Sequence, residues 1–401
     1  MVLQIVGGTY IEKCLFPEWN EVFGSGLRAA LAAKALGADV AFHTYAGSDS
    51  LPTLASRAEI AGVCLYPVET DLAVGFEYVH GLSTPLITPA PGLIRHERPL
   101  EAKGDAVLRF GFMEGDAVVN GGRVVYDPQN PYLPETYHKN GSRADHLAMV
   151  CNRAEAWLLT NEREPQKAAE TLRAKEACEV VVVKCGSHGC VVCEADGIAH
   201  IPAFKTDFVW PIGSGDVFAG TFAKVWAADG ASAVDAARLA SRAVAFYCST
   251  MTLDFADPRF AAFDPKPFIP ADERKPASVY LAGPFFSMSQ NWLIEEAFRA
   301  LEGQQLRVFS PLHHVGRGRA DEVYDKDIGG LEKADLVFAC VDGLDSGTIF
   351  EIGYAAARGK RVIAFVQNER PEDLKMLEGA GCLLERDFVT AIYRTYWLAR
   401  G

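Results

Sequence analysis

The chain has 401 residues, a length for which two domains are the usual expectation. Hydrophobic residues make up 49% of it and charged residues 23%, a balance that supports buried cores rather than a disordered chain. The formal charge of −13 argues against an extended nucleic-acid surface, which needs clustered Lys and Arg, although an acidic protein still binds nucleotides locally. The composition therefore favours an enzyme of small molecules over a protein that binds a nucleic acid polymer.

No apolar run approaches the roughly 20 residues that a membrane helix requires. The N-terminal segment, residues 1–8, begins a strand and lacks the basic flank of a signal peptide. The ten cysteines are scattered, which is typical of reduced, buried thiols. Cys190 and Cys193 lie on a valine-rich strand, where their side chains point to opposite faces, so we expect no zinc or redox pair. We expect a cytoplasmic protein that does not bind membranes.

Residues 1–265 are predicted to form the first domain. Apolar runs alternate there with helical stretches, a pattern typical of a mainly parallel sheet with helices on both faces. A glycine-rich turn from Pro211 to Asp216 opens a helix of small residues. Glycines let backbone amides converge and the helix N-terminus adds its positive dipole end, so this turn suits an anion. Ser-Gly-Asp before a helix is also an ordinary N-cap, so this motif alone does not decide the function.

Further segments, in chain order, place this turn in a larger pattern. They are Gly24-Ser25-Gly26 leading into residues 29–42, Ala46-Gly47-Ser48-Asp49, Val125-Tyr126-Asp127-Pro128-Gln129 at a strand end, residues 158–164, and residues 180–189. In this order they resemble the ribokinase-like, or PfkB, family of sugar and nucleoside kinases across about residues 2–250. The resemblance implies an α/β fold with a small β-lid over the sugar, and residues 70–91, with a strand at 74–79, look like part of that lid.

The same resemblance implies roles for the residues at the matching positions. Asp216 would be the catalytic base, and the amides of Gly213, Ser214 and Gly215 would stabilise charge on the transferring phosphoryl group. The remaining implied residues serve the nucleotide, the metal and the acceptor. They are Gly186 and Gly189 near ATP, Asn161 and Glu164 organising Mg²⁺ through its waters, and Glu12 and Gly24 at the acceptor.

Two departures from the family pattern lie near the acceptor. Arg28 stands where the family usually has Asn, and Trp210-Pro211 replaces Asp-Thr before the glycine turn. Arg28 could bind a phosphate or carboxylate on the acceptor, because guanidinium groups suit those anions. The alternative is a solvated helix arginine. Since the catalytic turn is intact, we interpret the departures as signs of an unusual substrate.

A proline-rich linker is predicted at residues 266–276, followed by a second, smaller α/β domain at residues 277–401 with a flavodoxin- or Rossmann-like fold. Its strands are expected near Val279–Leu281, Leu336–Cys340 and Arg361–Val366. The runs Leu281 to Phe286, Ala334 to Ala339 and Asp345 to Ala355 follow one another in an order that resembles the nucleoside 2-deoxyribosyltransferase family over residues 277–368.

This second resemblance implies a site that cleaves the bond between a sugar and a base. Glu351 would be the nucleophile that traps the oxocarbenium-like sugar, as in retaining glycosidases. The other implied residues are Asp345 and Asp327 as acids of the site, Tyr280 orienting the nucleophile, and Gly283 at the substrate. The alternative from the residues alone is a capping box from Thr348 to Glu351, with Asp345 as a turn residue.

Together the two resemblances imply a bifunctional enzyme that uses ATP and Mg²⁺ to phosphorylate a sugar or nucleoside and that cleaves or exchanges an N-glycosidic bond. Hydrolysis and transfer differ only in whether water or a second base reaches the glycosyl-enzyme. We expect small-molecule substrates and a homo-oligomer. The alternative is a nucleotide sensor in which one or both domains are inactive, and a purely structural fusion is a third reading, against which the retained acids count.

Overall fold

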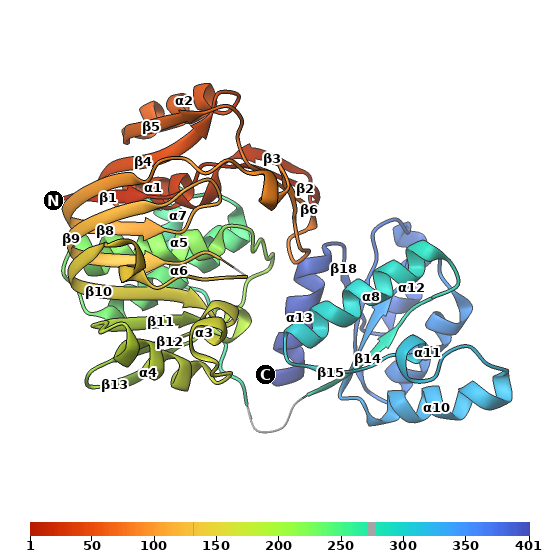
Figure 1. Ribbon diagram of the computed structural model, residues 1–401. Coiled ribbons are helices and arrows are strands. Elements are labelled where there is room, and N and C mark those ends of the chain that lie inside the picture. The colour runs from red at the N-terminus through yellow and green to blue at the C-terminus, as the bar shows by residue number, and fades with distance from the viewer. Residues whose placement is uncertain (131, 272–276) are drawn as a thin grey trace. The chain divides into compact units, whose positions relative to one another are not determined.

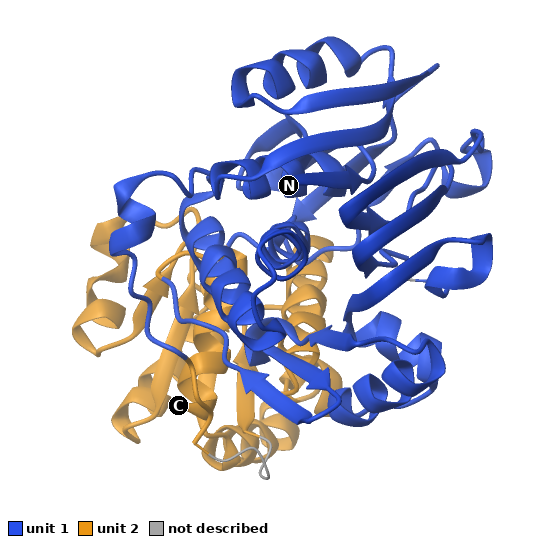
Figure 2. Cartoon of the chain, turned by 90° about the vertical axis from the view of Figure 1, so that its left-hand side faces the viewer, with its two compact units in different colours: residues 1–206, 210–267 blue, residues 207–209, 268–401 orange. Residues whose placement is uncertain are grey.

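A computed structural model describes residues 1–130, 132–271 and 277–401 of the chain (Figure 1). Two compact units are formed, coloured separately in Figure 2. Unit 1 consists of Met1–Thr206 and Trp210–Pro267, and unit 2 of Asp207–Val209 and Phe268–Gly401. The linker predicted at 266–276 includes residues 272–276, which lie outside the described residues. The assignment of Asp207–Val209 to unit 2 has no signal in the sequence.

The large sheet of unit 1 is mainly parallel, as predicted. Its strand order is β13-β12-β11-β10-β9-β8-β1-β4-β5, and only the hairpin of β12 and β13 adds antiparallel pairs within the described residues. The valine run of β11 is buried throughout, as expected for a strand with both faces covered. The strands are β1 (Val2–Val6), β4 (Asp39–Gly47), β5 (Cys64–Thr70), β8 (Leu100–Phe110), β9 (Ala117–Asp127), β10 (Arg143–Asn152), β11 (Val180–Lys184), β12 (Cys190–Glu194) and β13 (Gly197–Ile201).

Helices cover both faces of this sheet, which confirms the predicted layering. One core packs residues of α1, α2, α5 and α6 against the sheet, and a second core packs residues of α3 and α4 on the other face. Cys190 belongs to the first core and Cys193 to the second, as the strand period predicts. The helices are α1 (Gly24–Ala35), α2 (Leu51–Ala61), α3 (Arg153–Thr160), α4 (Pro165–Lys175), α5 (Ser214–Phe222), α6 (Ala233–Thr250) and α7 (Pro258–Ala262), with a π-helical turn η4 (Ala223–Ala228) after α5.

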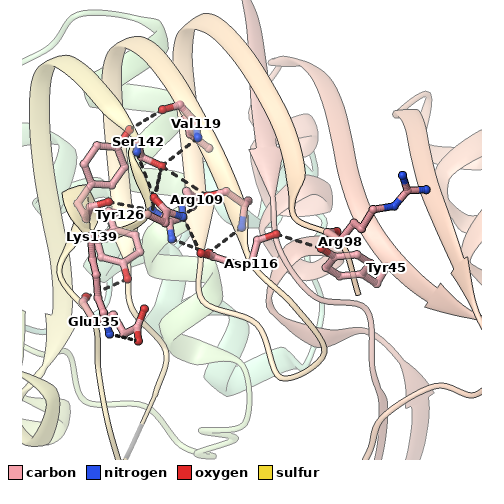
Figure 3. Close-up of polar contacts among 12 residues, drawn as sticks. Tyr45, Arg98, Arg109, Asp116, Val119, Tyr126, Glu135, Lys139 and Ser142 are labelled. Atoms are coloured by element: carbon pink, nitrogen blue, oxygen red, sulfur yellow. Dashed lines mark hydrogen bonds and ion pairs between the residues drawn. The ribbon is translucent and has the colours of Figure 1, made fainter. Parts of the chain in front are cut away.

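The connection between the parallel strands β8 and β9 departs from the usual helical crossover. Residues 111–116 join the two strands without a helix, whereas parallel strands ordinarily need a connection of about a dozen residues or more. A buried polar network holds this region together (Figure 3). Arg109 forms an ion pair with Asp116 at 2.7 Å and also donates to the hydroxyl of Ser142 at the start of β10. The network joins β8 to the residues that immediately precede β9 and β10.

A second, small sheet of unit 1 carries one of the predicted site residues. It pairs β2 (Ile11–Phe16), β3 (Trp19–Val22), β6 (Gly75–His80) and β7 (Leu86–Thr88) in the order β3-β2-β6-β7. The segment predicted as part of a lid supplies β6 and β7. The partner strands β2 and β3 come from a part of the chain for which no lid strand was predicted.

Unit 2 contains a parallel sheet with the order β15-β14-β16-β17-β18. Counted within the unit this order is 2-1-3-4-5, the flavodoxin-like arrangement. The three predicted strands are present, and β15 and β18 are short strands that were not predicted. The elements are β14 (Ser278–Ala282), α8 (Met288–Gly303), β15 (Arg307–Phe309), α9 (Pro311–His314), α10 (Ala320–Lys333), β16 (Leu336–Cys340), α11 (Ser346–Ala357), β17 (Arg361–Phe365), α12 (Pro371–Gly379), β18 (Leu383–Glu385) and α13 (Phe388–Arg400).

Candidate active sites

The glycine turn before α5 has the form that the sequence predicts. Gly213 is the N-cap residue of α5 and has a left-handed backbone with φ of 76°. Asp216 lies in the first turn of the helix and is buried. The amide of Ser214 donates to the carbonyl of Pro211 at 3.0 Å, so in this conformation it has a partner within the turn. The turn presents its helix N-terminus beside the Asp216 carboxylate, an arrangement suited to an anion next to a base.

Arg28 is buried in an ion-pair cluster that joins three elements. Its side chain is 0% exposed, and its Nη1 donates to Glu12 Oε1 at 3.0 Å and to Asp216 Oδ2 at 2.8 Å, while Nη2 pairs with Glu12 Oε2. The guanidinium also lies 4.7 Å from the centre of the Phe23 ring. A Cβ atom added at Gly213 would come within 2.2 Å of the Arg28 side chain. The reading of Arg28 as a solvated helix arginine is therefore wrong.

Both carboxylate oxygens of Asp216 accept hydrogen bonds. Arg28 donates to Oδ2, and the side-chain amide of Gln129 donates to Oδ1 at 2.6 Å. Burial raises the pKa of Asp216 above its usual range, while the nearby Arg28 guanidinium opposes that rise. A carboxylate with a raised pKa and fixed orientation suits a general base near neutral pH.

Glu12 and Gly24, the residues predicted to lie at the acceptor, contact each other directly. Gly24 is the first residue of α1, has φ of 74°, and donates its amide to Glu12 Oε1 at 3.0 Å. Trp210, one of the two departures from the family pattern, is buried and donates its indole N–H to the hydroxyl of Tyr247 at 3.2 Å. That hydroxyl in turn donates to the carbonyl of Ile212 at 2.8 Å. Trp210 is therefore linked to the glycine turn through the Tyr247 hydroxyl.

A second buried charge cluster lies beside the same turn and was not predicted as part of the site. Lys184, at the end of β11, pairs with Asp127, at the end of β9, at 2.5 Å. Burial raises the pKa of Glu155 to about 7, and the charge of Asp127 adds to the rise. A Cβ atom added at Gly215 would lie 3.3 Å from Lys184 Nζ. The signal was available in the sequence, since polar residues that end parallel strands of one sheet, here β9 and β11 on either side of β10, lie at the same edge of that sheet.

The predicted metal and nucleotide residues lie on turns of the same unit. Asn161 follows α3 with φ of 64° and is exposed, as is Glu164, which pairs with Lys167 at 3.4 Å. Gly186 and Gly189 flank the turn between β11 and β12, with φ of 58° and 77°. Among the residues that the structure describes, no group of three or more His, Cys, Asp or Glu side chains is placed to hold a metal ion.

In unit 2, Tyr280 and Glu351 form a direct pair. The hydroxyl of Tyr280, on β14, donates to Glu351 Oε1, on α11, at 2.5 Å. Burial raises the pKa of Glu351 to about 7, the Tyr280 hydrogen bond lowers it, and the charges of Asp327 and Asp345 raise it. The loops after β14 and β16 leave the sheet where the strand order reverses, which is the place at which such sheets bind ligands.

The remaining predicted residues of unit 2 surround this pair. Burial raises the pKa of Asp327, on α10, and its Oδ1 is buried without a hydrogen-bond partner. Asp345 is the N-cap residue of α11 and accepts from the amide of Thr348 at 2.9 Å. The capping-box reading is therefore wrong, because Asp345 caps the helix and Glu351 bonds to Tyr280. Gly283 directly follows β14, where a Cβ atom would lie 2.5 Å from Ile294 Cδ1.

Two segments of the chain match models of known protein families. Residues 119–257 match the model of the pfkB family of carbohydrate kinases, and residues 279–385 match that of nucleoside 2-deoxyribosyltransferase. The chain therefore joins a ribokinase-like domain to a nucleoside 2-deoxyribosyltransferase-like domain. No helix in the described part of the kinase-like or the transferase-like domain is long and apolar enough to span a membrane.

Solved structures and one curated sequence are also similar to parts of the chain. Aminoimidazole riboside kinase from Salmonella enterica, complexed with aminoimidazole riboside and an ATP analogue, is 14% identical, covers 65% of this chain and 99% of its own, and gives a TM-score of 0.52. The nucleoside kinase of Methanocaldococcus jannaschii, also 14% identical, covers 65% and 97% of the two chains, with a TM-score of 0.49. The uncharacterised protein UU063 of Ureaplasma parvum is 29% identical over 102 residues, which are 22% of this chain and 65% of that protein's length. At 14% identity, the likeness to the aminoimidazole riboside kinase structure is evidence for the fold alone.

Proposed function

We propose that the chain is a bifunctional enzyme of nucleoside and nucleotide metabolism. Unit 1 would transfer phosphate from ATP to a hydroxyl of a sugar or nucleoside, and unit 2 would cleave or exchange the bond between a sugar and a base. The observation that supports this most is that each unit places a carboxylate whose pKa is raised by burial in the first half of a helix, Asp216 on α5 and Glu351 on α11. The two family matches support the pairing of these activities.

In the kinase reaction, Asp216 would accept the proton of the acceptor hydroxyl while that oxygen attacks the terminal phosphorus of ATP. Glu12 would orient the acceptor, and the N-terminus of α5 would stabilise the negative charge on the transferring group. Lys184 lies beside the same turn, where its charge is balanced by the ion pair with Asp127. The protein's part in this reaction is positioning and electrostatic stabilisation.

The expected Mg²⁺ would be held through its waters by Asn161 and Glu164. Their exposed amide and carboxylate oxygens are hard donors in contact with solvent, which fits a metal that keeps most of its waters. When bound, the ion would neutralise phosphate charge on the nucleotide. Asp216 and Glu12 would carry out the proton transfer and the orientation of the acceptor.

In the second reaction, the carboxylate of Glu351 would attack the anomeric carbon of a nucleoside as the bond to the base breaks. Tyr280 would hold the carboxylate in place through its 2.5 Å hydrogen bond. Water or a second base would then release the sugar from Glu351. Asp327 has a buried oxygen without a protein partner, so it is suited to contact a sugar hydroxyl or the leaving base.

The two reactions can be tested together by incubating the full chain with ATP, Mg²⁺ and a panel of nucleosides and free sugars. Mass spectrometry would follow ADP, phosphorylated acceptor and free base over time. ADP that forms only with a particular acceptor would support the kinase activity, and free base without ATP would support the cleavage activity. If neither product forms with any member of the panel, the proposal fails.

A nucleotide sensor is the second candidate for unit 1. The engagement of both Asp216 oxygens by Arg28 and Gln129 favours it, because a base already bonded on both sides is less available to a substrate hydroxyl. A sensor would bind ATP without forming ADP in the same panel. The homo-oligomeric state and the cytoplasmic location stay predictions.

A further inference from the structure

Three of the five N–H groups of the Arg28 guanidinium donate to protein carboxylates. Both hydrogens of Nη1 are used, one by Glu12 and one by Asp216, and Nη2 pairs with Glu12. The remaining donor on the chain side, Nε, is buried without a partner, and the side chain lies against the backbone of Gly213. Because the Arg28 side chain is 0% exposed and lies against Gly213, a phosphate on the acceptor could form the two-pronged contact that arginine favours only by displacing a carboxylate or by moving the backbone that covers Nε.

The cluster as a whole carries a negative charge. Two carboxylates and one guanidinium give a net charge of −1, and Arg28, Glu12 and Asp216 are exposed by only 0%, 6% and 8%. Buried charges are poorly screened, so an anionic group on the acceptor would be repelled unless donors offset its charge, as the amides at the N-terminus of α5 would for the transferring phosphoryl group. An uncharged hydroxyl meets no such repulsion.

Other elements packed around Asp216 offer little compensating charge. Within the described part of the chain, the ionisable groups of other elements that interact with Asp216 or with its partners Arg28 and Glu12 include Tyr10, Tyr78 on β6, Tyr247 on α6 and Lys184 on β11. Burial raises the pKa of Tyr10, Tyr78 and Tyr247, so these side chains are neutral at physiological pH. Lys184 is already paired with Asp127.

We propose that Arg28 is a positioning residue that holds Glu12 and Asp216 toward the hydroxyl of an uncharged acceptor, so that unit 1 selects neutral sugars or nucleosides over phosphorylated or carboxylated ones. This inference rests on the proposed kinase function. As the acceptor oxygen bonds to the terminal phosphorus, the bond from phosphorus to the bridging oxygen of ADP breaks and the hydroxyl proton passes to Asp216. The cluster then changes from −1 to neutral, and Arg28 keeps its bonds to Glu12.

The first test compares matched acceptors with the wild-type chain. Adenosine and ribose are neutral, whereas adenosine 5′-monophosphate and ribose 5-phosphate keep the other hydroxyls but carry a phosphate on the 5-oxygen. The neutral 5′-O-methyladenosine, which loses the same hydroxyl without gaining charge, separates repulsion of the phosphate from loss of the acceptor: if it competes with adenosine and the monophosphate does not, the charge is what is rejected. For each pair that serves as a substrate, we expect kcat/KM to be higher for the neutral member by about 100-fold or more. This is the scale of like-charge repulsion in a desolvated site. A preference for the phosphorylated member would overturn the inference.

The second test replaces the arginine. Arg28→Lys keeps the charge but loses the planar fork, and should lower kcat by about 10- to 100-fold with the KM for ATP unchanged. Arg28→Asn also removes the charge that opposes the raised pKa of Asp216, so the acidic limb of its pH–rate profile should move to higher pH. A loss of thermal stability with unchanged kcat and pH profile would mean a structural role and would overturn the positioning role.

Arg57→Lys is the matched control. Arg57 lies against the same Phe23 ring, at 4.6 Å, but pairs with Glu21 instead of Asp216. Its replacement should leave kcat and the pH profile unchanged.

If wild-type protein transfers no phosphate to any acceptor, the kinase proposal fails and calorimetric binding of the same four paired compounds decides the inference. Binding of neutral members alone would support it, and binding of the phosphorylated members or of none would overturn it.

Discussion

Asp216 in unit 1 and Glu351 in unit 2 are both carboxylates whose pKa is raised by burial, but different groups face them. A guanidinium opposes the rise at Asp216, whereas Glu351 has a phenol hydrogen bond on one side and the charges of Asp327 and Asp345 nearby. A base needs to be ionised and held in one orientation, and a cation with a fork of donors does both. A nucleophile needs an accessible, poorly stabilised anion, which a single hydrogen bond allows.

The largest expected effect comes from removing the Glu351 charge. Glu351→Gln should lower base release by about 10⁴-fold or more, because a neutral amide does not form the glycosyl-enzyme. The kinase reaction and the melting temperature should stay close to wild type, since Glu351 does not cap α11. Asp325→Asn, at an exposed acid on α10, is the matched control. Base release at the wild-type rate in Glu351→Gln would leave unit 2 without an identified nucleophile.

Asp216→Asn is expected to have the next largest effect. Phosphoryl transfer should fall by about 10²-fold or more, the scale of general-base catalysis, while ATP still binds. Steady-state kinetics and calorimetric titration with ATP would measure the two quantities. Asp235→Asn, at an exposed position of α6, should change neither. Near-normal turnover of the Asp216 variant would show that Asp216 is not the general base of the kinase reaction.

The pH dependence of cleavage sharpens the comparison. Glu351 has a pKa of about 7, so cleavage should decline as the pH falls through that value and the carboxylate becomes protonated. Tyr280→Phe removes a hydrogen bond that lowers this pKa, and the decline should then begin at higher pH. Single-turnover rates between pH 5 and about 9 would show the shift. Identical profiles for the two proteins would mean that Tyr280 does not act on the ionisation of Glu351.

The smallest effect is expected at the metal residues. Glu164→Gln should raise the Mg²⁺ concentration for half-maximal kinase rate by about 3- to 10-fold, because a water-mediated carboxylate contact is weakened and not lost. Titration of the kinase rate with Mg²⁺ would measure it, with Glu162→Gln as control. An unchanged Mg²⁺ requirement would favour a purely structural loop around Asn161.

The sequence predicts the layered sheets well because buried strands such as β11 and β16 have strong, regular patterns. The sequence indicates which acids belong to the candidate site only through their resemblance to the motifs of a family, taken in the same order along the chain. A carboxylate near the start of a helix is by itself ambiguous, because it also serves as a helix cap. Asp345 and Glu351 illustrate this, because their spacing alone does not say which one caps α11. Partners from distant segments are harder still. The Arg28 to Asp216 ion pair joins residues whose separation in the chain leaves no local signal.

The close approach of Gly213 to Arg28 has a consequence for how the chain can change over generations. Any side chain at position 213 would occupy the space of the guanidinium, so a substitution there alone should both strain the backbone and displace Arg28. In a background with a shorter residue at 28, that second penalty disappears. The two positions should therefore show non-additive free energies of unfolding, and the order in which they are substituted would decide whether the intermediate protein still folds.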